Sequence, residues 1–137
     1  MLYLRDLRRA VHPGQPAHVP GPLLGGLPDR GYTLARAVGV RDRVVFAYDV
    51  PTAELPRVYA LSDIFVMPSR ADEAACDVEG FGLVFIEANA CGKPVIGGRS
   101  GGISDAVVDG KTGVLVDPGD TDGLAAAIVE LLEDPEL

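Results

Sequence analysis

Two glutamates and a glycine-rich turn stand close together in the sequence and could bind a sugar or a phosphate. Glu79 and Glu87 are eight residues apart, and the first is followed by Gly80-Phe81-Gly82. A helix is predicted to begin after this turn, and its first N–H groups and positive dipole end would favour a phosphate. Glycine lets such a backbone approach a ligand without a side chain in the way.

Glu87 follows the apolar run 83–86. A carboxylate in such a run needs a hydrogen-bonding partner, because burying it without one is costly. A pair of sugar or ribose hydroxyls is one such partner. The alternative for both glutamates is a surface position, since acidic residues are common in the first turns of helices. Gly80 and Gly82 could likewise serve only a tight turn.

Patterns for other chemistry are weak. The loop that holds Asp72, Glu73, Asp77 and Glu79 is acidic, but it lacks the spacing of a calcium loop, and a solvated loop is the better interpretation. The sequence has no Cys/His metal spacing, no Gly-x-Ser-x-Gly elbow and no Walker-type loop. A receiver-like domain would need an acceptor Asp after a central strand, whereas Asp63 precedes its strand.

Composition narrows the class of protein. The chain has 137 residues, of which 47% are apolar and 23% charged, as expected for one globular domain. A net charge of −8 argues against nucleic-acid binding. No apolar run approaches the roughly 18 residues of a membrane span, and no signal peptide is recognised at the N-terminus. Cys76 and Cys91 are expected to be reduced thiols in the cytoplasm.

Two regions are predicted. Residues 1–31 are expected to be an irregular, poorly packed segment, because residues 12–31 alone contain five Pro and five Gly. Met1–Val11 is expected to form at best a short basic amphipathic helix. The regular domain is expected to span residues 32–137. Charge also differs along the chain, since residues 1–48 carry a net +4 and residues 49–137 a net −12.

Short apolar strands alternate with helices in the second region. Strands are predicted at residues 44–48, 64–67, 94–96 and 113–116. Helices are predicted at 32–38, 52–61, 82–90, from the turn at 97–102 through 108, and after a cap at Asp120 or Thr121. Continuous apolar strands are typical of a parallel sheet covered by helices on both faces. A ligand site is expected beside the carboxyl ends of such strands.

Two helices have a predicted buried stripe. In the helix at 52–61, where Pro56 is tolerated in the first turn, the stripe is Leu55, Val58, Tyr59 and Leu61. In the last helix it is Leu124, Ala127, Ile128, Leu131 and Leu132.

From about Val44 onward, the chain resembles the C-terminal nucleotide-binding domain of family 4 retaining glycosyltransferases, which have the GT-B fold. The blocks that carry the resemblance are Glu54–Ser69, Glu79–Gly92, Lys93–Gly102 and Asp109–Pro118, in family order and with family-like spacing. The match, from about Val44 onward, covers about two thirds of the chain. Residues 77–82 are most similar to the phosphatidylinositol mannoside mannosyltransferase branch, which uses GDP-mannose.

The resemblance implies a role for each matching residue. Glu79 would contact hydroxyls of the donor sugar as the catalytic residue, and Glu87 would hold the ribose hydroxyls. Residues 48–50 would meet the base. The sugar and diphosphate would be met by backbone groups of Gly80, Phe81, Gly82 and Leu83. The implied activity is transfer of a hexose, mannose or glucose, from a GDP- or UDP-sugar to a lipid or glycan acceptor, without a metal or another cofactor.

The chain also departs from the family pattern. The family opens this domain with an apolar strand, a Gly-x-Gly loop, and an Arg and a Lys that grip the diphosphate. Residues 23–30 are a damaged version of this opening, in which Arg30 is the candidate phosphate-binding arginine. The first strand is therefore expected to be damaged or missing, and residues 12–31 have the composition that a frameshift would give.

The N-terminal domain that binds the acceptor in the family is missing as well. We therefore expect a fragment that is inactive alone, derived from a cytoplasmic enzyme, peripheral at the inner face of the membrane. The alternative is a non-enzymatic α/β module that binds a nucleotide or a partner protein. The pairing of Glu79 with Glu87 favours the enzyme.

Overall fold

The computed structural model describes residues 2–4, 30–44, 50–69 and 81–134. The chain divides into two compact units, one formed by Met1–Val11 with Ala53–Leu137 and the other by His12–Thr52. Several predictions lie outside the described residues. They concern the damaged first strand and Gly-x-Gly loop of the family pattern, most of the strand at 44–48 and the acidic loop. Cys76, Glu79 and Gly80 also lie outside the described residues.

The smaller unit contains one helix with a clear stop signal. Helix α1 spans Arg30–Ala37, as predicted within two residues, and the 3-10 helix η2 spans Arg41–Arg43. Gly39, just after α1, has a φ of 74°, which is a left-handed conformation that favours glycine. The guanidinium of Arg41 lies over the ring of Tyr32, 4.8 Å from its centroid.

Three parallel strands form the centre of the larger unit. They are β2 (Ile64–Met67), β3 (Val95–Gly98) and β4 (Val114–Val116), and each was predicted within two residues. The register pairs Phe65 with Val95 and Ile96 with Val114. Because the strands are parallel, their carboxyl ends lie at one edge of the sheet, as a Rossmann-like fold requires.

The first residues form a strand rather than the expected amphipathic helix. β1 (Leu2–Leu4) pairs antiparallel with β2, in the sheet order β1-β2-β3-β4. The helix prediction was wrong for these residues because it relied on local spacing alone. An unpaired edge of β2 offers a row of backbone donors and acceptors, which three apolar residues can satisfy as a strand.

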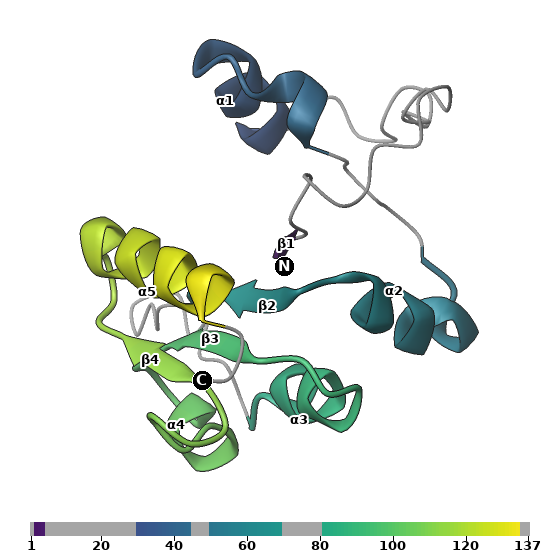
Figure 1. Cartoon of the computed structure of the whole chain (residues 1–137), viewed down its shortest axis with the longest axis vertical. Coiled ribbons are helices and arrows are strands. Elements are labelled where there is room, and N and C mark those ends of the chain that lie inside the picture. The colour runs from purple at the N-terminus through teal and green to yellow at the C-terminus, as the bar shows by residue number, and fades with distance from the viewer. Residues whose placement is uncertain (1, 5–29, 45–49, 70–80, 135–137) are drawn as a thin grey trace. The chain divides into compact units, whose positions relative to one another are not determined.

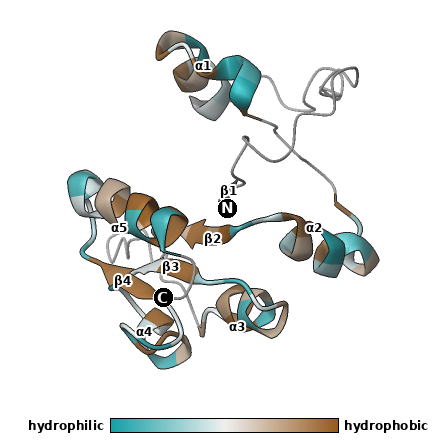
Figure 2. Ribbon diagram, in the orientation of Figure 1, coloured by the Kyte–Doolittle hydropathy of each residue, from teal (hydrophilic) through white to brown (hydrophobic). Residues whose placement is uncertain are grey.

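Helices cover both faces of the parallel strands, as predicted. Figure 1 shows α5 (Thr121–Glu133) on one face, and α3 (Leu83–Ala90) and α4 (Ile103–Ala106) on the other. Successive strand residues alternate between two cores. Phe65, Val95 and Leu115 join the core with α3 and α4, whereas the core with α5 contains Ile64, Val66, Ile96 and Val116. In Figure 2, β2 and β4 are accordingly mainly brown, β3 is paler where its two glycines lie, and the helices carry both colours.

Helix α2 (Leu55–Leu61) begins after a turn of 3-10 helix, η3 (Thr52–Glu54). Pro56 lies in its first turn, as expected. Tyr59 is buried, and Leu55 packs against the core. Leu61 was wrongly assigned to the buried stripe, because it is 59% exposed. The last residue of the stripe in α5 was wrong for the same reason, since Leu132 is 42% exposed.

Candidate functional site

The predicted helix start after the glycine turn is present. Gly82 is the residue before α3, with φ 70° and ψ 40°, in the left-handed region. Its carbonyl accepts the N–H of Phe85 at 3.0 Å. A Cβ at Gly82 would lie 2.9 Å from Cδ2 of Phe85, so both the backbone conformation and the space favour glycine. Gly82 has no side chain that could cap this helix end, and among the described residues no side chain is found to accept its first N–H groups.

One face of α3 is exposed beside this helix start. Leu83 is 63% exposed, Phe81 just before the helix is 53% exposed, and Glu87 lies one turn further along and is exposed. Leu83 and Glu87 are four residues apart and therefore share a face. The opposite face of α3 buries Phe85 and Ala88 in the core. The apolar run before Glu87 thus does not bury its carboxylate.

The partner of Glu87 is a tyrosine from another helix. The hydroxyl of Tyr59 in α2 donates to Oε2 of Glu87 at 2.8 Å. The sequence predicted that Glu87 needs a hydrogen-bonding partner, and this bond supplies one within the protein. Among the described residues, no other side-chain hydrogen bond to Glu87 is found. A carboxylate has about four acceptor positions, so most of its capacity remains for a ligand.

Tyr59 was predicted as a core residue only, and its contact with Glu87 was missed. The sequence offered one signal for this contact, a tyrosine within a predicted buried stripe. A buried tyrosine hydroxyl usually has a hydrogen-bonding partner, so one could have been expected. Its ring packs edge-on against Phe65, with centroids 5.7 Å apart. Phe65 packs in the same way against Phe85, at 5.5 Å. An aromatic cluster of Tyr59, Phe65 and Phe85 therefore supports both Glu87 and the helix start at Gly82.

Three other predicted site residues cannot be placed beside this helix. Glu79 and Gly80 lie outside the described residues. Arg30 is the first residue of α1, which belongs to the other compact unit. The structure therefore brings together Phe81, Gly82, Leu83 and Glu87 of the predicted set, and it adds Tyr59.

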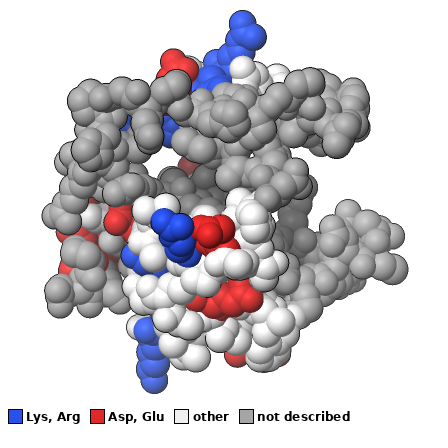
Figure 3. Space-filling view, turned by 90° about the vertical axis from the view of Figure 1, so that its right-hand side faces the viewer, with Lys and Arg blue, Asp and Glu red and all other residues white. Residues whose placement is uncertain are grey.

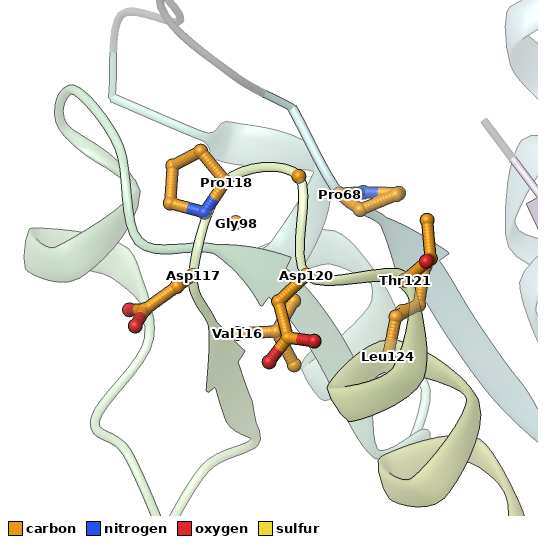
Figure 4. A pocket seen from close by; sticks show the side chains of 9 residues that line it. Pro68, Gly98, Val116, Asp117, Pro118, Asp120, Thr121 and Leu124 are labelled. Atoms are coloured by element: carbon orange, nitrogen blue, oxygen red, sulfur yellow. The ribbon is translucent and has the colours of Figure 1, made fainter.

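A small cavity lies at the carboxyl edge of the sheet, where the loops after β2, β3 and β4 meet α5 (Figure 4). Its volume is about 220 Å³. Its floor is apolar, with Val116 and Leu124 among the lining residues, and Asp117 and Asp120 lie at its rim. Ligand pockets usually have volumes of about 300–1,000 Å³, and Glu87 does not line this one. We therefore place the candidate site at α3 and not at this cavity.

Arg99 connects the ends of two strands next to the cavity. Its Nη2 donates to Oδ2 of Asp109 at 2.9 Å and to the carbonyl of Leu115 at 3.1 Å. Its Nε donates to Oδ1 of Asp117 at 3.3 Å. The hydrogen bond to Asp109 is the largest cause that raises the pKa of Arg99. The same bond, followed by one from the N–H of Leu115, lowers the pKa of Asp109.

The block Asp109–Gly113 has a structural role. The N–H of Val108 donates to Oγ1 of Thr112 at 2.9 Å, and the N–H of Gly110 donates to the carbonyl of Gly113 at the same distance. A Cβ at Gly113 would collide with Val95, so the loop closes tightly against β3. A second hollow of about 530 Å³ lies beside this loop and includes Lys93 and Lys111.

Charges of both signs lie close together on the described surface. On the face shown in Figure 3, basic and acidic side chains are adjacent. One such pair joins Arg57 and Glu54 in and before α2, with Nη1 and Oε2 3.1 Å apart. No group of three or more metal-binding side chains occurs among the residues that the structure describes. None of the described helices is long and apolar enough to cross a membrane.

The resemblance found in the sequence extends over nearly the whole chain. The sequence model described as "Glycosyl transferases group 1" matches residues 3–137. The chain belongs to this glycosyltransferase family. The family assignment agrees with the fold, a Rossmann-like parallel sheet with helices on both faces that corresponds to the C-terminal half of a GT-B fold.

Curated relatives within the glycosyltransferase family include a GDP-mannose-dependent alpha-(1-6)-phosphatidylinositol monomannoside mannosyltransferase of Mycolicibacterium smegmatis. It is 49% identical over 102 residues, which are 74% of this chain and 27% of the relative. The chain thus spans about a quarter of the length of the first curated relatives that it matches.

Solved glycosyltransferase structures superimpose on about three quarters of the chain. Sucrose-phosphate synthase from Thermosynechococcus elongatus superimposes with a TM-score of 0.69 at 37% identity, over 78% of this chain and 25% of that protein. Anabaena Alr3699/HepE in complex with UDP-glucose superimposes with a TM-score of 0.66 at 31% identity, over 77% of this chain and 27% of that one.

Proposed function

We propose that this chain is the donor-binding part of a retaining glycosyltransferase. The enzyme would move a hexose, mannose or glucose, from a nucleotide diphosphate sugar to a lipid or glycan acceptor. The acceptor would bind mainly to an N-terminal domain such as the family resemblance implies. The observation that carries the proposal is the start of α3, where a helix end that no described side chain caps and the exposed carboxylate of Glu87 share one helix.

The geometry of α3 suits a nucleoside diphosphate. Leu83 and Glu87 lie on one face and are separated by about 6 Å along the helix axis, at a rise of about 1.5 Å per residue. The ribose and the diphosphate of a nucleotide are neighbouring groups, so Glu87 can accept the ribose hydroxyls while the helix start receives a phosphate. Hydrogen bonds to a carboxylate are stronger than those between neutral groups. The dipole of α3 would also stabilise the phosphate that departs during transfer.

The remaining predicted residues take their roles from the family resemblance. Glu79 would contact the donor sugar as the catalytic residue. Backbone groups of Gly80, Phe81, Gly82 and Leu83 would meet the sugar and the diphosphate, and Arg30 would contact a phosphate. Phe81 and Leu83 are both exposed at the helix start, which supports their part in this assignment.

The donor base and the acceptor are finer parts of the proposal. The relative from Mycolicibacterium smegmatis is described as GDP-mannose-dependent and as acting on phosphatidylinositol monomannoside, which supports GDP-mannose and a lipid acceptor. The Anabaena structure contains UDP-glucose, so a UDP-sugar is the competing donor. With a lipid acceptor, the transfer reaction would take place in the cytoplasm, at the inner face of the membrane. Transfer without a metal ion also belongs to this proposal, because the helix dipole can stabilise the leaving diphosphate.

Nucleotide binding by the 137-residue chain tests the proposal. Titrations followed by NMR with GDP, GDP-mannose, UDP and UDP-glucose are expected to shift signals of residues 81–87, with one base preferred. Glu87→Gln is expected to weaken binding about tenfold or more, because it removes the charge that accepts the ribose hydroxyls. Glu133→Gln at the exposed end of α5 is the matched control and is expected to change nothing. Equal affinities for the Glu87→Gln variant and the unsubstituted chain would contradict the proposal.

A transfer assay separates the enzyme from the non-enzymatic alternative. We expect no sugar transfer by the 137-residue chain alone, since the matched residues are only 27% of the length of the relative. Fusion to the N-terminal domain of the Mycolicibacterium smegmatis relative is expected to restore transfer from GDP-mannose. A fused protein that binds nucleotide as tightly as the relative does but never transfers sugar would favour a binding module. Among the described residues, no observation favours that alternative.

A further inference from the structure

The hydrogen bond between Tyr59 and Glu87 has a consequence for ligand selection. We propose that Tyr59 is a positioning residue, which fixes the carboxylate of Glu87 so that the site prefers ribonucleotides over 2′-deoxyribonucleotides. This inference rests on the proposed function, because it takes Glu87 as the residue that accepts the ribose hydroxyls. Tyr59 itself is 2% exposed and does not contact the ligand in this proposal.

The first step concerns the freedom of Glu87. Its side chain has three rotatable bonds and lies on an exposed helix face, so without a partner its carboxylate would sample many positions. Two vicinal hydroxyls require acceptor oxygens at fixed places. The bond from the Tyr59 hydroxyl to Oε2, at 2.8 Å, selects one arrangement of the carboxylate before any ligand arrives. Ordering the group in advance reduces the entropy lost on binding.

The second step concerns the rigidity of Tyr59. Its ring belongs to α2, 28 residues before Glu87 in the sequence, and it is held edge-on by Phe65 at 5.7 Å. Phe65 is in turn held by Phe85 at 5.5 Å, and both phenylalanines are fully buried. The hydroxyl therefore has little freedom to follow a moving carboxylate. The rigid Tyr59 hydroxyl therefore sets the position of the Glu87 carboxylate, and not the reverse.

The third step connects this cluster with the phosphate end of the site. Phe85 lies directly below Gly82, where an added Cβ would be 2.9 Å from its ring. The same three aromatic rings thus support the carboxylate that would bind ribose and the helix start that would bind phosphate. Their spacing fixes the distance between the two groups, which is a requirement for recognising a whole nucleotide.

Tyr59→Phe in the 137-residue chain tests the inference. The substitution removes only the hydroxyl and keeps the ring in the aromatic cluster. Affinities for GDP and 2′-deoxy-GDP are measured by NMR titration, or for UDP and 2′-deoxy-UDP if the chain prefers uracil. We expect Tyr59→Phe to weaken binding of the ribonucleotide about five- to tenfold and to leave binding of the 2′-deoxynucleotide within about twofold. Tyr32→Phe, in the other unit, is the matched control and is expected to leave the ratio unchanged.

Equal weakening of both nucleotides would overturn the inference, because a merely structural role lowers both affinities alike. If the ratio of ribonucleotide to 2′-deoxynucleotide affinity is the same in Tyr59→Phe as in the unsubstituted chain, the inference is overturned too. Glu87→Gln separates this failure from failure of the proposed function. If Glu87→Gln removes the ribose preference and Tyr59→Phe does not, the positioning role is wrong while the proposed function stands. If Glu87→Gln leaves the preference intact, the proposed function itself is wrong.

A measurement without ligand covers the case in which the isolated chain binds nucleotides too weakly to titrate. The ¹³C relaxation of the Glu87 side chain reports its mobility directly. We expect the side-chain order parameter of Glu87 to fall in the Tyr59→Phe chain and to stay unchanged in the Tyr32→Phe chain. An unchanged order parameter in Tyr59→Phe would overturn the inference.

Discussion

Gly82 meets two separate constraints at one position. Its φ of 70° is a conformation that side chains with a Cβ adopt only at a cost, and the ring of Phe85 fills the space that a Cβ would need. Gly92 has the same φ of 70°, but no atom lies within 4 Å of an added Cβ there. Substitution at Gly92 therefore reports the cost of backbone strain alone, whereas substitution at Gly82 adds the cost of a steric clash.

Gly82→Ala is expected to lower the free energy of unfolding by about 2 kcal/mol or more, from backbone strain plus displacement of Phe85. Gly92→Ala is expected to cost about 1 kcal/mol, from backbone strain alone. Urea unfolding of both variants measures the difference. Equal losses of unfolding free energy in the two variants would show that the Phe85 ring moves aside at little cost and that a Cβ at Gly82 can be accommodated.

At the scale of the element, the start of α5 is fixed by a single carboxylate. The sequence allowed either Asp120 or Thr121 as the cap. In the structure, Oδ1 of Asp120 accepts the N–H of Gly123 at 2.8 Å, so Asp120 is the cap and Thr121 is the first helical residue. The choice depends on which backbone conformation the loop after β4 imposes, and neighbouring residue types alone do not settle it.

Asp120→Ala is expected to destabilise the chain by about 1 kcal/mol, because one N–H of the first turn loses its acceptor. Thr121→Ala is expected to stay within about 0.5 kcal/mol of the unsubstituted chain. Thermal unfolding followed by circular dichroism compares the two. A larger loss for Thr121→Ala would show that the cap had been assigned to the wrong residue.

The stabilisation that the Arg99–Asp109 pair gives between the ends of β3 and β4 is expected to depend on pH through Asp109. Its pKa lies below the ordinary value of 3.8, mainly because of the hydrogen bond from Arg99. A lowered pKa in the folded state means that the stabilisation is present above the unfolded pKa and is lost as the pH falls through the folded pKa. Arg99 stays protonated throughout, since its own pKa is raised.

Asp109→Asn is therefore expected to reduce stability at pH 7 by about 0.5–1 kcal/mol, a modest value because the pair is exposed to solvent. The difference from the unsubstituted chain should remain constant from about pH 8 to pH 5 and shrink below about pH 4. Urea unfolding at a series of pH values measures it, with the exposed Asp105→Asn as control. A difference that grows on acidification would contradict this assignment.

At the scale of the whole molecule, the described units expose several large apolar side chains. The most exposed are Leu34, Val38, Leu61, Phe81 and Leu83. β4 is also an edge strand of the described sheet, and edge strands can pair with other chains. The first curated relative is almost three times as long as this chain, because the 102 matched residues are only 27% of it.

We expect the 137-residue chain to associate with itself as its concentration rises, since exposed apolar groups gain by leaving water. Sedimentation velocity over a hundredfold range of concentration measures this. Replacing Leu61 and Val129, both more than half exposed, with Gln is expected to weaken the association. A chain that stays monomeric over the whole range would contradict the prediction.

Most of the larger unit follows from local patterns in the sequence. The three parallel strands, the helix after Gly82 and, in the smaller unit, the end of α1 before Gly39 were predicted within two residues, because apolar runs and glycine conformations act locally. The errors are the helix expected at Leu2–Leu4, which is a strand, and the ends of two predicted stripes. Leu61 and Leu132 have the right spacing to be buried, but the packed neighbours end before they reach these side chains.

By itself, the sequence determined the order of strands and helices from α2 onward, the glycine before α3 and the family to which the chain belongs. Only the tertiary structure decided that Leu2–Leu4 pairs with β2 and that Tyr59 holds Glu87. Both are contacts between residues far apart in the chain. Periodicity and turn residues report a few neighbouring positions, whereas such contacts depend on how whole elements pack against one another.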